Sequence, residues 1–153
     1  MPFGPGDIIE IKTPAGLAYV QVTHNHTAYP EIVRVIEGLF TERPSDIRKL
    51  ARRATVFTTM VPLSGALELH KIEGTKIGSE NVPDEDKPFP TFKLPIRDKN
   101  GEVVYWWLWE GDGLRHTLVD DGSYDGYPVR EVPTITNFLE RIRTTVPKSS
   151  PLA

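Results

Sequence analysis

Proline and glycine interrupt this chain so often that long regular elements have little room to form. The 153 residues include 14 prolines and 12 glycines, and both residue types break helices and the interiors of strands. Many of the segments between them alternate apolar and polar residues, as half-buried strands do. We therefore predict a β-rich α+β fold: an SH3-like or strongly curved antiparallel sheet, a partial barrel, with a short internal helix and a C-terminal helix.

Two hairpins are the clearest local predictions. "GDIIEIKTPAGLAYVQVTH" reads as two strands joined by a turn at residues 14–16, and "TFKLPIRDKNGEVVYWWLWEG" as two strands joined at residues 99–101. In the second turn, Asn100-Gly101 tolerates the positive φ angles of a tight hairpin. "EIVRVIEG", "TVFTTMV" and "ALELHKI" are assigned to further strands, and residues 73–90 to an irregular exposed loop. The total is six to eight strands.

Two segments have helical spacing. In "ERPSDIRKLARRA", Ser45 is the expected N-cap, Asp46 suits the first turn, and the helix ends near Arg53. In "TITNFLERIRTTVP", the apolar residues fall on one stripe that ends before a proline. We expect a single domain over residues 1–147 and an unstructured tail over residues 148–153.

Charge and cysteine content exclude several classes of function. The net charge of −3 supplies no global field that would attract nucleic acid or a membrane surface. The absence of cysteine excludes disulfides, thiolate zinc sites and cysteine nucleophiles. Neither a signal peptide nor an apolar run of about 20 residues is present. We expect a cytoplasmic protein with no cofactor and no membrane partner, and nucleic acid is not an expected partner.

Histidine offers a weak case for metal chemistry. His24 and His26 could share one face of a strand end, and His116 could supply a third ligand to zinc, nickel or manganese. The simpler interpretation is exposed polar residues in a turn.

A basic ridge on the internal helix is the candidate for nucleic acid. Residues 48 and 52, and residues 49 and 53, are one helical turn apart, so their cationic groups could meet phosphates. The simpler interpretation is the solvated face of an amphipathic helix. The ridge consists of Arg48, Lys49, Arg52 and Arg53.

"YWWLWEGDG", at residues 105–113, holds all three tryptophans of the chain. In a strand, Tyr105, Trp107 and Trp109 share one face, which we assign to the core, while Trp106 lies on the other face. Five acidic residues and a single arginine lie between residues 110 and 125. Aromatic side chains beside concentrated charge suit a protein-binding patch, although a core strand with an ordinary loop would have the same sequence. The patch consists of Trp106, Glu110, Asp112, Asp120, Asp121 and Asp125.

The two ends of the chain carry a resemblance to a known family. "GDIIEIKTPAGLAYVQV" opens with Gly6-Asp7 before a strand and continues to Tyr19 and Gln21, and "YPVREVPTITNFLERI" closes the chain. Together these segments resemble immunity protein family 26 of bacterial polymorphic toxin systems, whose members open with a similar Gly-Asp strand and Tyr-x-Gln strand. The resemblance implies a small cytoplasmic β-rich protein that binds and neutralises a cognate toxin domain, without catalytic residues that could be carried over.

Three functional hypotheses follow. The first is a non-enzymatic immunity protein that uses the acidic and aromatic patch to bind its toxin. The second is a small barrel that binds RNA through the basic ridge and a stacking tryptophan. The third is a metal-dependent hydrolase built on the histidines. The oligomeric state has no sequence signal.

Overall fold

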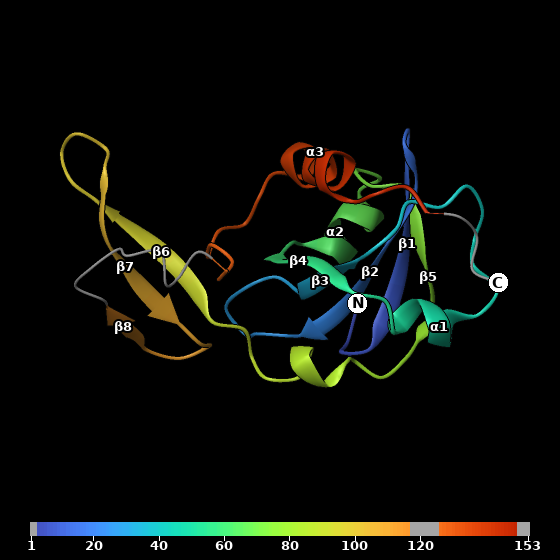
Figure 1. Cartoon of the computed structure of the whole chain (residues 1–153), viewed down its shortest axis with the longest axis horizontal. Coiled ribbons are helices and arrows are strands. Elements are labelled where there is room, and N and C mark those ends of the chain that lie inside the picture. The colour runs from blue at the N-terminus through green and yellow to red at the C-terminus, as the bar shows by residue number, and fades with distance from the viewer. Residues whose placement is uncertain (1–2, 117–125, 150–153) are drawn as a thin grey trace. The chain divides into compact units, whose positions relative to one another are not determined.

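The computed structural model describes residues 3–116 and 126–149, and within these ranges the chain forms eight strands and three α-helices (Figure 1). The strands are β1 (Asp7–Thr13), β2 (Gly16–His24), β3 (Ile32–Ile36), β4 (Thr55–Met60), β5 (Gly74–Ser79), β6 (Phe92–Arg97), β7 (Val103–Trp109) and β8 (Leu114–His116). The helices are α1 (Ile47–Ala51), α2 (Leu63–Glu68) and α3 (Ile135–Thr145), with a turn of 3-10 helix, η1, at Asp84–Asp86.

Backbone contacts divide the chain into two compact units. Unit 1 comprises Met1–Lys87 and Val132–Ala153, and unit 2 comprises Pro88–Glu131. Unit 1 therefore contains the five strands β1–β5 and all three α-helices, whereas unit 2 contains β6, β7 and β8.

The sheet of unit 1 is antiparallel with the strand order β4-β3-β2-β1-β5. The predicted hairpin is confirmed: Ile9 pairs with Val20 and Thr13 with Gly16. Gly16 adopts a φ of +137°, and a Cβ atom there would lie 3.0 Å from the carbonyl oxygen of Phe40. Glycine is therefore required at the start of β2 both by its conformation and by the close backbone behind it.

Both faces of this sheet are buried. On one face, Ile9, Val20 and Val33 pack with Phe138 of α3 and Leu63 of α2. The predicted C-terminal helix and its apolar stripe are thereby confirmed, with Thr134 as N-cap. The other face carries a second apolar cluster, formed by Ile8, Tyr19, Ile36 and Phe40 with Leu50 and Ala51 of α1.

The predicted curvature is wrong, although the β-rich α+β class is confirmed. The sheet is open: β4 and β5 are its two edges, and the described residues form neither a closed barrel nor a strongly curled sheet. The physical reason lies in the two apolar layers, because a sheet covered by helices on both faces buries its side chains without closing on itself.

Three local predictions also need correction. "ALELHKI" is not a strand, because residues 63–68 form α2, whose Leu63 and Ala66 are buried in the core. Residues 74–79, assigned to a loop, form β5 and pair with β1. Asp46, rather than Ser45, caps α1, since its carboxylate accepts hydrogen bonds from the backbone N–H groups of Arg48 and Lys49.

Unit 2 is a three-stranded antiparallel sheet of order β6-β7-β8. The predicted β6–β7 hairpin is confirmed, and Gly101 in its turn has a φ of +86°. The buried residues at its base are Phe92, Leu108 and Trp109. Phe89 and Phe92 pack against Trp109 with ring centroids 5.4 and 5.8 Å from it, so one aromatic cluster forms the core of this unit.

The segment after α3 is held to unit 1 by backbone pairing. Leu39 pairs with Lys148, and the N–H of Ser149 donates to the carbonyl oxygen of Leu39 at 2.8 Å. Lys148 and Ser149 belong to the predicted tail. The rest of that tail, residues 150–153, lies outside the described ranges. Within the described part of the chain, no helix has the length and apolar character needed to span a bilayer.

Candidate binding surface

The distal part of the β6–β7 hairpin, residues 94–107, is here named the arm. The register pairs Leu94 with Trp107, Pro95 with Trp106 and Ile96 with Tyr105. Alternation places Leu94, Ile96, Tyr105 and Trp107 on one face of the arm, and Pro95, Val104 and Trp106 on the other. Each of these seven side chains is half-buried or exposed.

The prediction for the aromatic strand is therefore only partly right. Trp109 is 5% exposed and belongs to the core, as expected, but Tyr105 and Trp107 are half-buried. The reason is the length of β8, which has three residues and pairs only with residues 107–109 of β7. Among the described residues, no third strand pairs with β7 nearer the turn, and the apolar side chains there keep part of their surface in contact with water.

Two of the tryptophans are oriented by nearby cationic side chains. The ammonium group of Lys93, a residue only 8% exposed, lies 4.5 Å from the ring centroid of Trp106. The guanidinium of Arg130 lies 5.2 Å from the ring of Trp109. Both are cation–π contacts that hold an indole in one orientation. Trp106 is half-buried, and the sequence had placed it on the binding face.

Two acidic residues of the predicted patch follow this strand in the described part of the chain. Glu110 and Asp112 are exposed in the β7–β8 turn, where they border a hollow of about 210 Å³ with Leu114. The hydroxyl of Thr91 donates to the Glu110 carboxylate at 3.2 Å. The other three acids, Asp120, Asp121 and Asp125, lie outside the described residues.

The predicted basic ridge is divided by the fold. Arg48, Lys49 and Arg52 are exposed on or just after α1, but Arg53 is half-buried. Its Nε donates to the carbonyl oxygen of Glu37 at 2.8 Å, and its guanidinium lies 5.6 Å from the ring of Phe40. Arg48 and Arg52 border a cavity of about 460 Å³ whose other wall carries Asp84 and Glu85. Carboxylates on that wall oppose the binding of a phosphate chain.

His24 and His26 are both engaged in hydrogen bonds. His24, at the end of β2, has Nδ1 3.0 Å from the Thr23 hydroxyl and Nε2 2.7 Å from the carbonyl oxygen of Lys87. His26 accepts the backbone N–H of Ala28 through Nδ1 at 3.0 Å. Among residues 3–116 and 126–149, no three His, Cys, Asp or Glu side chains converge as a metal site would require. The His116 side chain is outside the description, so the metal-hydrolase hypothesis stays a prediction.

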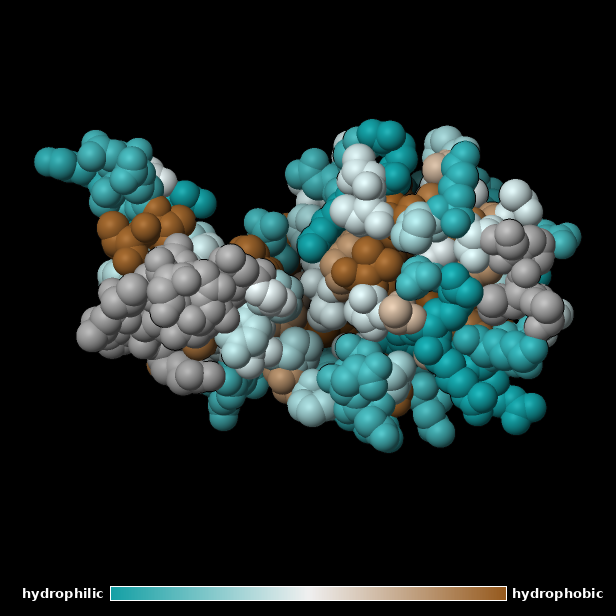
Figure 2. Space-filling model, viewed as in Figure 1, coloured by the Kyte–Doolittle hydropathy of each residue, from teal (hydrophilic) through white to brown (hydrophobic). Residues whose placement is uncertain are grey.

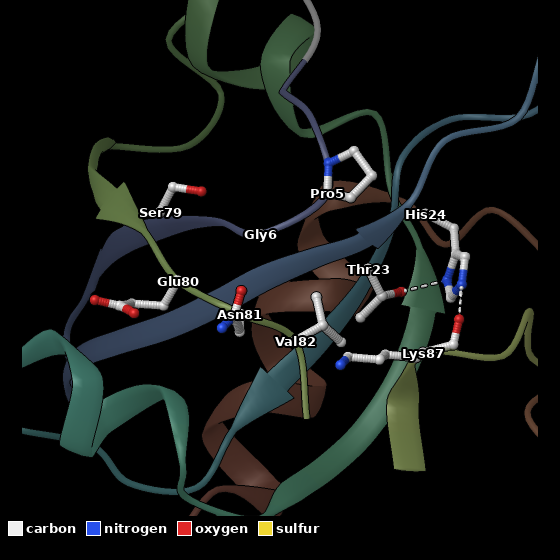
Figure 3. Close-up of a pocket in the computed structure, with 9 residues that line it drawn as sticks. All are labelled: Pro5, Gly6, Thr23, His24, Ser79, Glu80, Asn81, Val82 and Lys87. Carbon is white, nitrogen blue, oxygen red and sulfur yellow. Dashed lines mark hydrogen bonds between the residues drawn. The ribbon is translucent and has the colours of Figure 1, made fainter. Parts of the chain in front are cut away.

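A second cavity of about 460 Å³ lies beside His24 (Figure 3). Its walls are the chain before β1, the end of β2 and residues 79–82, with Lys87 at one side. Residues 80–87, here named the strap, border both large cavities of unit 1. The amide of Gln21 holds the strap from the sheet by donating to the carbonyl oxygens of Gly6 and Glu80 at 3.2 and 2.8 Å.

A buried polar layer under the strap escaped the sequence interpretation. Arg34, on β3, is fully buried, and its Nε donates to the Gln21 side-chain oxygen at 2.8 Å. Its Nη groups donate to the carbonyl oxygen of Ala51, the last residue of α1, to that of Arg53, and to the hydroxyl of Thr55. Arg34 therefore caps the C-terminal end of α1. The sequence signal for this buried layer is an arginine between two valines in the apolar segment "IVRVI".

A carboxylate completes this layer. Glu10 is 3% exposed and accepts the Tyr19 hydroxyl at 2.8 Å and the fork of Arg43 at 2.8 and 3.1 Å. The Arg43 hydrogen bonds lower the pKa of Glu10 most; burial opposes them, and the Tyr19 hydroxyl lowers it further. The pKa of Tyr19 is raised, first by burial and then by the Glu10 carboxylate.

The residues that carry the N-terminal resemblance have structural roles. The N–H of Gly4 donates to the Asp7 carboxylate at 2.9 Å, and Gly6 has a φ of +97° close to the Glu80 carbonyl. Tyr19 and Gln21 stand side by side on β2, where one binds Glu10 and the other binds Arg34 and the strap. Comparison with family models, with curated proteins and with solved structures finds no match.

Proposed function

We propose that the protein is a non-enzymatic binding protein that neutralises a cognate bacterial toxin. The observation that carries this proposal is the arm, whose aromatic and aliphatic side chains are only partly buried. Figure 2 shows hydrophobic surface directly beside the hydrophilic tip of this hairpin. Trp and Tyr are the residues that most often dominate binding energy in protein interfaces, so half-exposed Tyr105, Trp106 and Trp107 are suited to anchor a partner.

The charge distribution of the chain specifies the sign of the partner's charge. Unit 2 contains five Lys and Arg residues and eight Asp and Glu residues, whereas unit 1 contains thirteen of each class. The entire net charge of −3 therefore resides in unit 2. Such a field steers a positively charged partner toward the unit that carries the arm and raises the association rate. A toxin that acts on nucleic acid presents a surface of this sign.

The resemblance to immunity protein family 26 supports the same proposal from the other end of the chain. Its motif residues, Gly6, Asp7, Tyr19 and Gln21, lie in unit 1, where they stabilise the first strands and hold the strap. In this proposal unit 1 is the folded support and unit 2 provides the contact surface. No catalytic step is assigned to either unit.

The test measures association with a toxin. The reading frame immediately upstream is sequenced first, and a toxin domain encoded there serves as the probe. The readout is the association rate constant at several salt concentrations. Reversal of charge at Asp120, Asp121 and Asp125 to lysine should slow association at low salt at least tenfold and flatten its salt dependence.

The matched control is a triple reversal in unit 1, at Glu42, Asp84 and Glu85, all of which are exposed. It changes the net charge of the chain by the same amount and should have a much smaller effect. Equal effects of the two triple variants, or none, would remove the acidic surface of unit 2 from the proposal. Absence of binding by the wild-type chain would refute the function itself.

A further inference from the structure

The arm exposes apolar surface on both of its faces. Leu94 and Ile96 lie on one face with Tyr105 and Trp107, and none of the four is fully buried. On the other face, Val104 is 44% exposed. A two-stranded hairpin is marginally stable in water. A partner that covers both partly exposed apolar faces at the same time therefore stabilises the arm more than a partner that covers one face.

The tip of the arm forms hydrogen bonds within its own turn. The Asp98 carboxylate accepts the backbone N–H groups of Asn100 and Glu102 at 2.8 and 3.1 Å. The guanidinium of Arg97 donates to the carbonyl oxygen of Gly101 at 2.8 Å. Because these hydrogen bonds constrain the turn, binding it costs less conformational entropy than binding a loop without them would. The tip residues 97–102 carry two positive and two negative charges, so they are polar but electrically balanced.

We propose that the arm inserts into a cleft of its partner and contacts opposite walls with its two faces. This inference rests on the proposed function and specifies its geometry. Docking through one face would leave the other face half-exposed, whereas insertion covers both. A hairpin one sheet thick fits between walls about 10 Å from its midplane on either side, the distance at which layers pack on a sheet.

The occupant is a cationic partner rather than a second copy of this chain. Two copies would bring together two units that each carry three excess negative charges, which repel one another. A cleft lined by Lys and Arg, such as binds a nucleic-acid strand, has the complementary sign. The neutral tip can enter it, and the aromatic side chains of the arm can pack against its walls.

The experiment uses the absence of cysteine from the chain. Val104→Cys and Ile96→Cys each create a single thiol, one on each face of the arm, and each is labelled with an environment-sensitive fluorophore. The labelled full-length variants are titrated with the toxin domain encoded immediately upstream. Insertion predicts that both labels shift to the blue and become shielded from iodide when the complex forms.

Alanine variants give the energetic counterpart. Trp107→Ala and Trp106→Ala alter opposite faces, and each should raise the Kd at least tenfold, provided that circular dichroism shows both variants folded. A response of only one label, or an unchanged Kd for one variant, means docking through a single face and overturns the inference while leaving the function intact. A shift of either label on concentrating the chain alone would indicate self-association and would also overturn it. Failure of the unlabelled wild type to bind refutes both proposals.

Discussion

Replacement of Arg34 by methionine should be among the most destabilising changes available in unit 1. The guanidinium is fully buried and joins three parts of the chain: Gln21 on β2, Thr55 on β4, and the carbonyl groups that end α1. The Thr55 hydroxyl in turn donates to the Asp86 carboxylate at 3.1 Å. Burial lowers the pKa of Arg34, and the nearby acids Asp86 and Glu85 oppose that effect.

The magnitude follows from the acceptors that lose their donor. The carbonyl oxygens of Ala51 and Arg53 and the amide oxygen of Gln21 would be left without it. An unsatisfied buried acceptor costs about 1–3 kcal/mol, so three of them set a lower bound near 3 kcal/mol. A hydrogen bond that involves a charged group contributes about 1.5–3 kcal/mol. We therefore expect the free energy of unfolding to fall by about 3–5 kcal/mol.

Equilibrium unfolding in urea measures this loss. Arg48→Met is the matched control, because it makes the same substitution at an exposed position of α1 and should change stability by no more than about 0.5 kcal/mol. Arg34→Lys should remain destabilised, since an ammonium group lacks the planar fork that reaches several acceptors. If Arg34→Met lies within about 1 kcal/mol of Arg48→Met, the buried arginine is not the connection described here.

Two further predictions concern pH and glycine. The pKa of Glu10 is lowered in the folded chain, so its stabilising contribution is complete above the ordinary value of 4.5 and is lost as the pH falls through the folded-state value. Glu10→Gln should therefore reduce the difference in unfolding free energy between pH 7 and pH 3, and an unchanged difference would contradict this assignment. A Cβ atom at Gly74 would lie 2.2 Å from the carbonyl oxygen of Glu10, whereas one at Gly65 of α2 has no neighbour within 4 Å. Gly74→Ala should lower the thermal midpoint by separating β5 from β1. Gly65→Ala should raise the thermal midpoint, because alanine is more favourable than glycine in a helix by up to about 1 kcal/mol. The reverse order of the two midpoints would refute the packing at β5.

Local signals predicted the elements that depend on neighbouring residues. Alternation predicted β1, β2, β3, β4, β6 and β7, and a stripe of apolar residues predicted α3. The errors lie where tertiary contacts override propensity. Residues 63–68 follow Pro62 and form α2, because Leu63 and Ala66 bury against the core. The glycine-containing β5 has low strand propensity and forms where it supplies the hydrogen bonds that the edge of β1 needs.

The candidate site was predictable in part. The aromatic strand and the acids beside it stand out in the sequence, and half-buried Trp106 lies on the face predicted for it. That Tyr105 and Trp107 are also partly exposed could not be predicted, because their burial depends on how far β8 extends along β7. The division of the basic ridge depends on Glu37 and Phe40, which the fold brings beside Arg53.

The sequence by itself determined most of the short elements, including the two hairpins and α3, and the absence of thiol chemistry, since each of these follows from residue identity and spacing along the chain. Only the tertiary structure decided that the sheet stays open, because β5 pairs with β1 across 63 to 72 residues of sequence rather than joining β4. It also decided the polar layer, in which Glu10, Gln21 and Arg34 meet partners on other strands. A buried charge is stable only where such partners converge, and alternation along one strand carries no information about them.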